Sequence, residues 1–395
     1  MTEIKDHSGI KGNPLDRCSP IEVGELISFL KKNPNSKYRI GAGLSGVSGA
    51  AVPLHDELYI DFSNYKKLNW IDKKSGLFSA FSGNTMFEIK NFVEKEGWDF
   101  PIMPGSFEKA TIGGMIACNG GGLFSLRYGK IGNFVREIDI VTCSGDKMKF
   151  GSQCSKISEG PDFSKLLIGS EGSLGFLDKI TLQCTRLPAI DLYRISSTSF
   201  SKLSASVCDF LKYNPIYLEM AEQDALRFSS GANESVIWLG LQKGMRFSPG
   251  NSKFKIENIP PQNINERLDI GRNLQKYKKF IDLDISFPVA HSSEILTELK
   301  FLLNNYNVES IFFGHAGDGN WHIHIFYDNL NPFNELMSSE FDLILLKYGG
   351  HISGEHGIGR IHKNRFIKFK DEGYQNLYGV FKKYLDPKNQ LPSIF

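Results

Sequence analysis

Several features are missing from this sequence of 395 residues, and each absence excludes a class of protein. Its six cysteines are scattered without a CxxC pair, which argues against a zinc ribbon or an iron–sulfur cluster and fits reduced thiols. A formal net charge of +2 gives no electrostatic case for a nucleic-acid partner. No run approaches the ~20 apolar residues of a membrane helix, and the polar first residues do not form a signal peptide. We therefore expect a cytoplasmic protein without a transmembrane segment; peripheral attachment to a membrane stays open.

Glycine, by contrast, is abundant and gathers in three segments. The densest runs from Pro104 to Gly129 (PGSFEKATIGGMIACNGGGLFSLRYG) and contains seven glycines. So many glycines weaken a helix or strand, but they let the backbone and its N–H groups approach a ligand closely. A flexible surface loop is the alternative, yet Ile112, Met115 and Ile116 are apolar anchors that a solvated linker does not need. We interpret the segment as a ligand cradle.

A second glycine-rich loop, Gly41 to Pro53 (GAGLSGVSGAAVP), follows a predicted strand over residues 37–40. Before that strand, Ser19-Pro20 predicts a helix with Ser19 as its N-cap. The loop matches the GxGxxG pattern of nicotinamide-binding folds, with Asp61 at a suitable distance. A strand-like segment at 58–62 replaces the long helix that such folds need, so we reject that interpretation and retain a phosphate cradle.

The third loop, Gly169 to Gly175 (GSEGSLG), precedes a predicted strand over 176–184. Further strands are expected at 77–81, 134–142, 216–220 and 236–242, and a helix at 85–96. Residues 247–261 are polar and contain proline and glycine, which predicts a loop. A domain boundary is expected near Pro188, followed by an α+β cap with an antiparallel sheet.

Five of the nine histidines fall in two short stretches of the C-terminal half. In GHAGDGNWHIHI (314–325), Trp321 begins a predicted strand on which His322 and His324 share one face. In GGHISGEHGIG (349–359), Glu355 and His356 are adjacent. Any one of these histidines alone is more typical of a structural or surface position. Together, two histidines and a carboxylate are a set that binds a divalent metal with open positions.

Such a set suits the oxidation of a 2-hydroxy acid. Its hydroxyl and carboxylate oxygens lie on adjacent carbons and chelate a dication. The dication lowers the pKa of the hydroxyl, as zinc lowers that of bound water to roughly 7. A histidine, with an ordinary pKa of ~6.5, then accepts the proton. Asp318 could orient a metal-binding histidine, or it could simply be a turn residue.

The three glycine loops, the HxGDGNxH pattern at 315–322 and GEHG at 354–357 resemble the FAD-linked D-2-hydroxyacid dehydrogenases of the vanillyl-alcohol-oxidase superfamily. These include D-lactate dehydrogenase, the glycolate oxidase flavoprotein subunit and D-2-hydroxyglutarate dehydrogenase. The resemblance implies an α+β fold: a two-part FAD-binding domain, a ferredoxin-like α+β cap and a C-terminal helical segment that completes the active site. The expected bounds are 1–188, 189–330 and 331–395.

The same resemblance assigns residues to roles. It implies that FAD contacts Gly43, Leu44, Ser45, Gly46, Val47, Ser48, Pro104, Gly105, Ser106, Thr111, Gly114, Ala117, Asn119, Glu171 and Ile180. It implies that the metal is bound by His315, His322 and Glu355, and that His356 is the catalytic base. The metal is expected to be zinc, with manganese or iron as alternatives. Some relatives bind FAD covalently through a histidine of the first loop; residues 41–53 contain none, so we expect non-covalent FAD.

The substrate-binding residues implied are Arg267, His324 and His356. Arginine suits a carboxylate because its fork binds both oxygens; the alternative for Arg267 is a solvated helix face. Relatives that act on hydroxyglutarate carry lysine at the position of Asp282 and asparagine at that of His324. Both departures favour a small monocarboxylate such as D-lactate or glycolate. A third departure is the missing NPGK motif near the C-terminus, which puts in doubt a flavin contact made there.

We therefore expect a dehydrogenase that uses FAD and a divalent metal and passes electrons to a quinone or a carrier protein; a homo-oligomer stays open. D-2-hydroxyglutarate dehydrogenase is one alternative, and a non-catalytic flavoprotein subunit of an electron-transfer complex is another. A metal-dependent hydrolase would leave the glycine loops unexplained.

Overall fold

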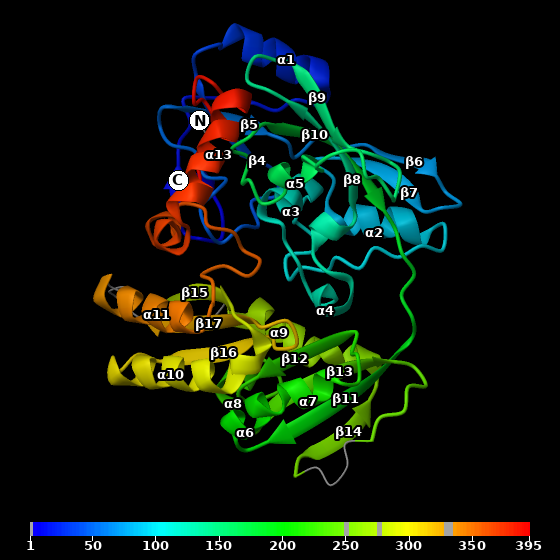
Figure 1. Ribbon diagram of the computed structural model, residues 1–395, viewed down its shortest axis with the longest axis vertical. Helices are drawn as coiled ribbons and strands as arrows, with labels where there is room; N and C mark the ends of the chain where they lie inside the picture. The colour runs from blue at the N-terminus through cyan, green and yellow to red at the C-terminus, as the bar shows by residue number, and fades with distance from the viewer. Residues whose placement is uncertain (1–2, 249–252, 275–278, 328–334) are drawn as a thin grey trace. The chain divides into compact units, whose positions relative to one another are not determined.

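The computed structural model describes residues 3–248, 253–274, 279–327 and 335–395. The chain forms two compact units (Figure 1). The first comprises Met1–Gly121, Lys130–Leu187 and His356–Phe395, and the second comprises Gly122–Gly129 and Pro188–Glu355. The predicted boundary at 330 lies outside the described residues. The predicted C-terminal segment is shared, because its residues up to Glu355 belong to the second unit and the rest to the first.

The first unit contains two main sheets. A parallel sheet has the order β3-β5-β4, with β3 at Asp16–Cys18, β4 at Lys37–Gly41 and β5 at Glu57–Asp61. An antiparallel sheet has the order β6-β7-β10-β8-β9. Its strands span Leu68–Asp72 (β6), Leu77–Phe81 (β7), Val135–Val141 (β8), Lys147–Gly151 (β9) and Phe176–Gln183 (β10). The short strands β1 (Ile4–Lys5) and β2 (Lys11–Gly12) pair with each other in a separate antiparallel sheet.

Six α-helices accompany these sheets in the described part of the first unit. They are α1 (Val23–Lys32), α2 (Met86–Glu94), α3 (Ile112–Cys118), α5 (Ser164–Leu167), α12 (Lys363–Phe366) and α13 (Glu372–Leu385). Helix α1 buries Leu26 and Leu30, four residues apart on one face, in a core shared with Tyr38 and Phe176. Helix α2 begins with a capping box between Thr85 and Glu88.

The second unit is built on one antiparallel sheet of seven strands with the order β14-β11-β13-β12-β16-β17-β15. The strands are β11 (Ile190–Ser197), β12 (Tyr217–Ala221), β13 (Ser235–Gln242), β14 (Lys255–Ile259), β15 (Lys279–Ser286), β16 (Ser310–His315) and β17 (Asn320–Tyr327). Its helices are α4 (Ser125–Tyr128), α6 (Phe200–Ala205), α7 (Val207–Leu211), α8 (Gln223–Leu226), α9 (Asn265–Leu274), α10 (Ser292–Asn305) and α11 (Glu335–Lys347). Helices α10 and α11 lie side by side (Figure 1).

Most of the predicted elements are confirmed, and the α+β fold class is confirmed with them. Two local predictions are wrong. Helix α1 has Glu22 as its N-cap, because the turn before it is held by a hydrogen bond from the Ile21 backbone N–H to the Glu25 side chain. Residues 255–259 form strand β14 rather than a loop, since they pair with β11. Among the described helices, none is long and apolar enough to cross a membrane.

A buried lysine, Lys382, forms hydrogen bonds to both the third glycine loop and the last residues of the chain. The Lys382 ammonium of α13 donates hydrogen bonds to the carbonyls of Ser173 and Leu391, at 2.9 and 3.0 Å. It also pairs with Asp386 at 2.7 Å, and both residues are buried. This lysine therefore holds residue Leu391 and the third glycine loop together within the first unit.

We expect Lys382→Met to lower the stability of the first unit by about 3–5 kcal/mol, because it leaves the Asp386 carboxylate buried without its cation. The shift of the urea midpoint measures this loss. Lys383→Met, at the exposed neighbouring position, is the matched control and is expected to change stability by no more than about 0.5 kcal/mol. Equal shifts for the two variants would contradict the assignment.

Candidate functional site

The first glycine loop follows β4 and packs on the second loop at Gly43, where there is no side chain to separate the two backbones. A Cβ added at Gly43 would lie 1.9 Å from the carbonyl oxygen of Lys109, so no larger residue fits between the loops. Leu44 adopts a left-handed conformation with φ 48°. Ser48 is buried, whereas Gly46 is exposed and the other predicted contacts from Gly43 to Val47 keep partial exposure.

The second glycine loop is ordered by its own polar residues. Thr111 caps α3 by accepting a hydrogen bond from the Gly114 N–H. Asn119 ends the helix in the left-handed region, and its side chain accepts from the Gly132 N–H at 3.3 Å. The predicted contacts at Gly105 and Ser106 are exposed. Their backbone is therefore accessible to a ligand.

The third loop and the segment after His356 close a ring with the first two loops. The N–H groups of Gly169 and Glu171 donate to the carbonyls of Ile116 and Ala117, each at 2.9 Å. The Glu171 carboxylate accepts from the N–H groups of Ile358 and Gly359. The Arg360 N–H then donates to the Ser48 carbonyl at 2.9 Å. The first loop thus contacts the second, the second contacts the third, and the third contacts the segment after His356, which returns to the first loop. All four segments belong to the first unit.

This ring fits an FAD site. Its loops present unsubstituted backbone at Gly43 and Gly105, and an anionic pyrophosphate is bound by the N–H groups of such backbone. Burial raises the pKa of the Glu171 carboxyl, against the opposing effect of its two backbone donors. Ile180 is fully buried in the middle of β10. The individual flavin contacts stay predictions.

A row of polar side chains occupies one face of the second unit's sheet. Strands β15, β17 and β16 place Asp282 opposite His324, Asp284 opposite His322, and His315 opposite Asn320. Directly opposed residues share a face, so these polar groups lie together. The other face takes the alternating apolar residues, such as Ile323 and Ile325, which are fully buried. The prediction that His322 and His324 share one face of their strand is confirmed.

The three predicted metal ligands meet on this face. One carboxylate oxygen of Glu355 lies 3.6 Å from Nε2 of His315 and 3.5 Å from Nε2 of His322. All three ligand atoms lie within 4.8 Å of one another. Ligands bound at 2.0–2.2 Å to a tetrahedral ion are about 3.3–3.6 Å apart. The described residues therefore fit a divalent metal with two nitrogen ligands and one oxygen ligand.

Two further carboxylates surround the three ligands. Asp284 accepts hydrogen bonds from the backbone N–H groups of Gly354 and Glu355, at 3.0 and 2.8 Å, and its other oxygen lies 3.9 Å from Nδ1 of His322. Glu219 of β12 lies 2.7 Å from Nδ1 of His315. Burial alone would lower the pKa of His315, but Glu219 and Glu355 outweigh it and raise the pKa well above 6.5.

Arg267, the predicted carboxylate-binding residue, is buried on α9 with 5% of its surface exposed. The alternative of a solvated helix face is therefore wrong. Its Nε lies 3.1 Å from Glu219, and its guanidinium carbon Cζ lies over the ring of Phe313, 4.8 Å from the centroid. Burial lowers the pKa of Arg267, although Glu219 and Glu355 oppose the shift.

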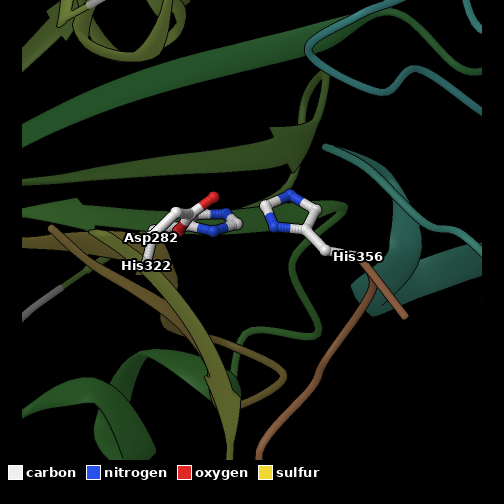
Figure 2. A group of neighbouring side chains, drawn as sticks. All are labelled: Asp282, His322 and His356. Atoms are coloured by element: carbon white, nitrogen blue, oxygen red, sulfur yellow. The ribbon is translucent and has the colours of Figure 1, made fainter. Parts of the chain in front are cut away.

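Asp282 and His324 extend the polar row beyond the three ligands. Nε2 of His324 lies 3.2 Å from Asp282, and the imidazole stacks on Phe280 with the ring centroids 4.4 Å apart. Figure 2 shows Asp282 beside His322, which belongs to the neighbouring strand β17. A negative group thus stands next to the ligand set on the side away from Glu219.

His356, also drawn in Figure 2, begins the last part of the first unit, and its carbonyl accepts a hydrogen bond from Ser48 at 3.4 Å. It is peptide-bonded to Glu355, and consecutive Cα atoms are 3.80 Å apart. The predicted base and a predicted metal ligand are therefore neighbours by covalent structure alone. The role of His356 stays a prediction.

Sequence reasoning missed Glu219 and Asp284, which lie next to the predicted ligands His315 and His322. Asp318 is exposed, and its side chain accepts from the Asn320 N–H at 3.3 Å as a turn residue does. The partner of His315 is Glu219, which sits alone in YLEMA as the acidic residue of a buried strand. That placement was the available signal, because an acidic side chain in a buried strand needs a partner.

Comparisons with known proteins agree with both halves of this description. Residues 19–151 match the family described as FAD binding domain, and residues 268–393 match that described as FAD linked oxidases, C-terminal domain. The chain is 28% identical to D-lactate dehydrogenase of Archaeoglobus fulgidus, covering 94% of this chain and 88% of that protein. It is 27% identical to mitochondrial D-2-hydroxyglutarate dehydrogenase of Arabidopsis thaliana, covering 94% and 72%. Among solved structures, alkyldihydroxyacetonephosphate synthase matches with a TM-score of 0.72 at 16% identity, over 95% of this chain and 75% of that one.

Gly43→Ala tests the contact between the first two loops. We expect it to lower the stability of FAD-free protein by about 1–3 kcal/mol, because its Cβ overpacks against Lys109, and to reduce the FAD retained on purification. The control is Gly46→Ala, whose Cβ would have its nearest neighbour 3.7 Å away at Asp6 and should leave FAD-free stability unchanged. Thermal unfolding and flavin absorbance measure the two effects. An unchanged Gly43→Ala protein would show that the loops are not packed this way.

Proposed function

The chain belongs to the FAD-linked hydroxyacid dehydrogenases and oxidases, since both domains of these enzymes are matched along it, and from this premise we propose that it oxidises a small D-2-hydroxy acid, D-lactate or glycolate, to the 2-oxo acid. The observation that carries the proposal is the grouping of His315, His322 and Glu355, together with a buried arginine, Arg267, that pairs with the carboxylate next to His315. A metal with open positions and a guanidinium suit a hydroxyl and a carboxylate on adjacent carbons.

The proposed mechanism assigns one task to each residue. When bound, FAD supplies the hydride acceptor, and a dication supplies a Lewis acid that lowers the pKa of an alcohol. Arg267 binds the substrate carboxylate through its terminal guanidinium nitrogens. His356 accepts the hydroxyl proton at an imidazole nitrogen, and the substrate's C2–H bond then releases its hydrogen as hydride. His315, His322 and Glu355 would hold the metal. The resemblance alone supports a quinone or a carrier protein as electron acceptor.

Anaerobic reduction of the flavin tests this function. We expect D-lactate to bleach the flavin absorbance of the purified protein and L-lactate to leave it unchanged. Removal of the metal by a chelator is expected to abolish bleaching while FAD stays bound, because the metal and flavin residues belong to separate units.

Restoration of bleaching by added zinc or manganese is the control for damage by the chelator. Full bleaching after verified metal removal would overturn the role of the metal. Failure of every D-2-hydroxy acid tested, in metal-loaded protein, would overturn the activity.

The Asp282–His324 pair supports a monocarboxylate over a dicarboxylate. A second carboxylate on the substrate would approach Asp282 beside His322, and like charges brought together in a buried site cost several kcal/mol. D-2-hydroxyglutarate is the competing substrate, because several relatives carry that name.

We expect Asp282→Lys to shift the ratio of kcat/KM for D-2-hydroxyglutarate to that for D-lactate upward by on the order of tenfold or more, equivalent to ~1.4 kcal/mol or more. Asp269→Lys makes the same charge change on the exposed surface of α9 and should leave the ratio unchanged. If the wild type already prefers hydroxyglutarate, or if the two variants shift the ratio equally, Asp282 does not select the substrate.

A further inference from the structure

Glu219 contacts both halves of the proposed substrate site. It lies on β12, and 1% of its surface is exposed. One carboxylate oxygen is 2.7 Å from Nδ1 of His315, and the other is 3.1 Å from Nε of Arg267. A single buried carboxylate therefore joins a proposed metal ligand to the proposed carboxylate-binding residue.

On the histidine side, Glu219 fixes which nitrogen is available. A carboxylate at Nδ1 accepts a hydrogen bond from that nitrogen, which leaves Nε2 as the nitrogen that binds a metal in place of a proton. Nε2 of His315 is the atom that faces Glu355, at 3.6 Å. Loss of the carboxylate would free the imidazole to rotate or to take the other tautomer, and its contribution to the metal site would fall.

On the arginine side, Glu219 fixes the plane of the guanidinium. The guanidinium carbon of Arg267 lies over the ring of Phe313, 4.8 Å from its centroid, and a carboxylate oxygen of Glu219 lies 3.1 Å from Nε. Among the described residues, Glu219 is the acidic group within ion-pair distance of this arginine. With Nε engaged, the two terminal nitrogens form the edge that binds both oxygens of a carboxylate.

We propose that Glu219 is a positioning residue that sets the metal-binding imidazole and the carboxylate-binding guanidinium at one fixed separation. This inference rests on the proposed function. A 2-hydroxy acid carries its hydroxyl and carboxylate on adjacent carbons, so their separation is constant whatever the rest of the substrate is. One carboxylate that orients both binding groups matches that constant geometry.

Glu219→Gln tests the proposal, because the amide keeps the shape but offers one acceptor in place of two. We expect the dissociation constant for zinc, measured by competition with a chromogenic chelator, to rise 10–100-fold. At saturating zinc we expect KM for D-lactate to rise on the order of tenfold or more, since the guanidinium loses its orientation.

The matched control is Glu222→Gln. Glu222 is equally buried and follows the same strand, but it pairs with Lys300 and accepts from the Phe312 N–H, outside the site. This control should lose stability and keep the wild-type zinc affinity and KM. If Glu219 had only a structural role, Glu219→Gln would behave like this control: it would lose stability and keep the wild-type zinc affinity and KM.

Wild-type zinc affinity and KM in a folded Glu219→Gln protein would overturn the proposal. If that variant does not fold, Glu219→Gln/Arg267→Met removes the uncompensated buried cation, and its zinc dissociation constant should still rise 10–100-fold; an unchanged constant would again overturn the proposal.

Flavin bleaching of the wild type distinguishes failure of the Glu219 proposal from failure of the proposed function. A wild type that binds zinc and bleaches with D-lactate, beside an unaffected variant, defeats the role of Glu219 alone. A wild type that binds no zinc defeats both.

Discussion

Charge compensation on one face of a sheet is the constraint on which the second unit depends. Glu219 and Asp284 lie on that face, and most of each of their side chains is removed from water, as it is for Arg267 of α9 and for Glu355, which pair with groups of this face. Buried charges are tolerated only when they are paired and hydrogen-bonded. Arg267 neutralises one carboxylate, and backbone N–H groups satisfy Asp284. A dication between the imidazoles and Glu355 would complete the balance, which is why we place one there.

The register of strands β15, β16 and β17 makes this arrangement. Each position of β17 is set by its partners on both sides, so His322 lies between Phe313 and Asp284. A slip by one residue would send both histidines to the apolar face and bring isoleucines to the site. Asp284 of β15, the strand that pairs with β17, accepts a hydrogen bond from the Glu355 N–H, so the third predicted ligand is held next to the strand that carries His322. The grouping of the three predicted ligands is thus a consequence of strand pairing and of this hydrogen bond.

The parts of this fold that could be predicted are those with local signals. The glycine loops, the alternation through His322 and His324, and the adjacent Glu355 and His356 are visible in short windows of sequence. Glu219 and Asp284 were missed because their meaning comes from pairings between distant segments: Glu219 meets His315, 96 positions away. The same holds for the ring of flavin loops, in which Glu171 reaches Ile358, and for β14, whose residues become a strand only beside β11. Long-range contacts of this kind leave no periodic signal.

The central claim is that His315, His322 and Glu355 bind one dication. X-ray absorption at the zinc edge, on protein stripped by a chelator and reloaded with one equivalent of zinc, tests it most directly. The account predicts two imidazole ligands and oxygen ligands at about 2.0–2.2 Å, with no sulfur. The imidazole signal should weaken in His322→Ala and persist in His324→Ala. A spectrum without imidazole, or one that His322→Ala leaves unchanged, would contradict the claim.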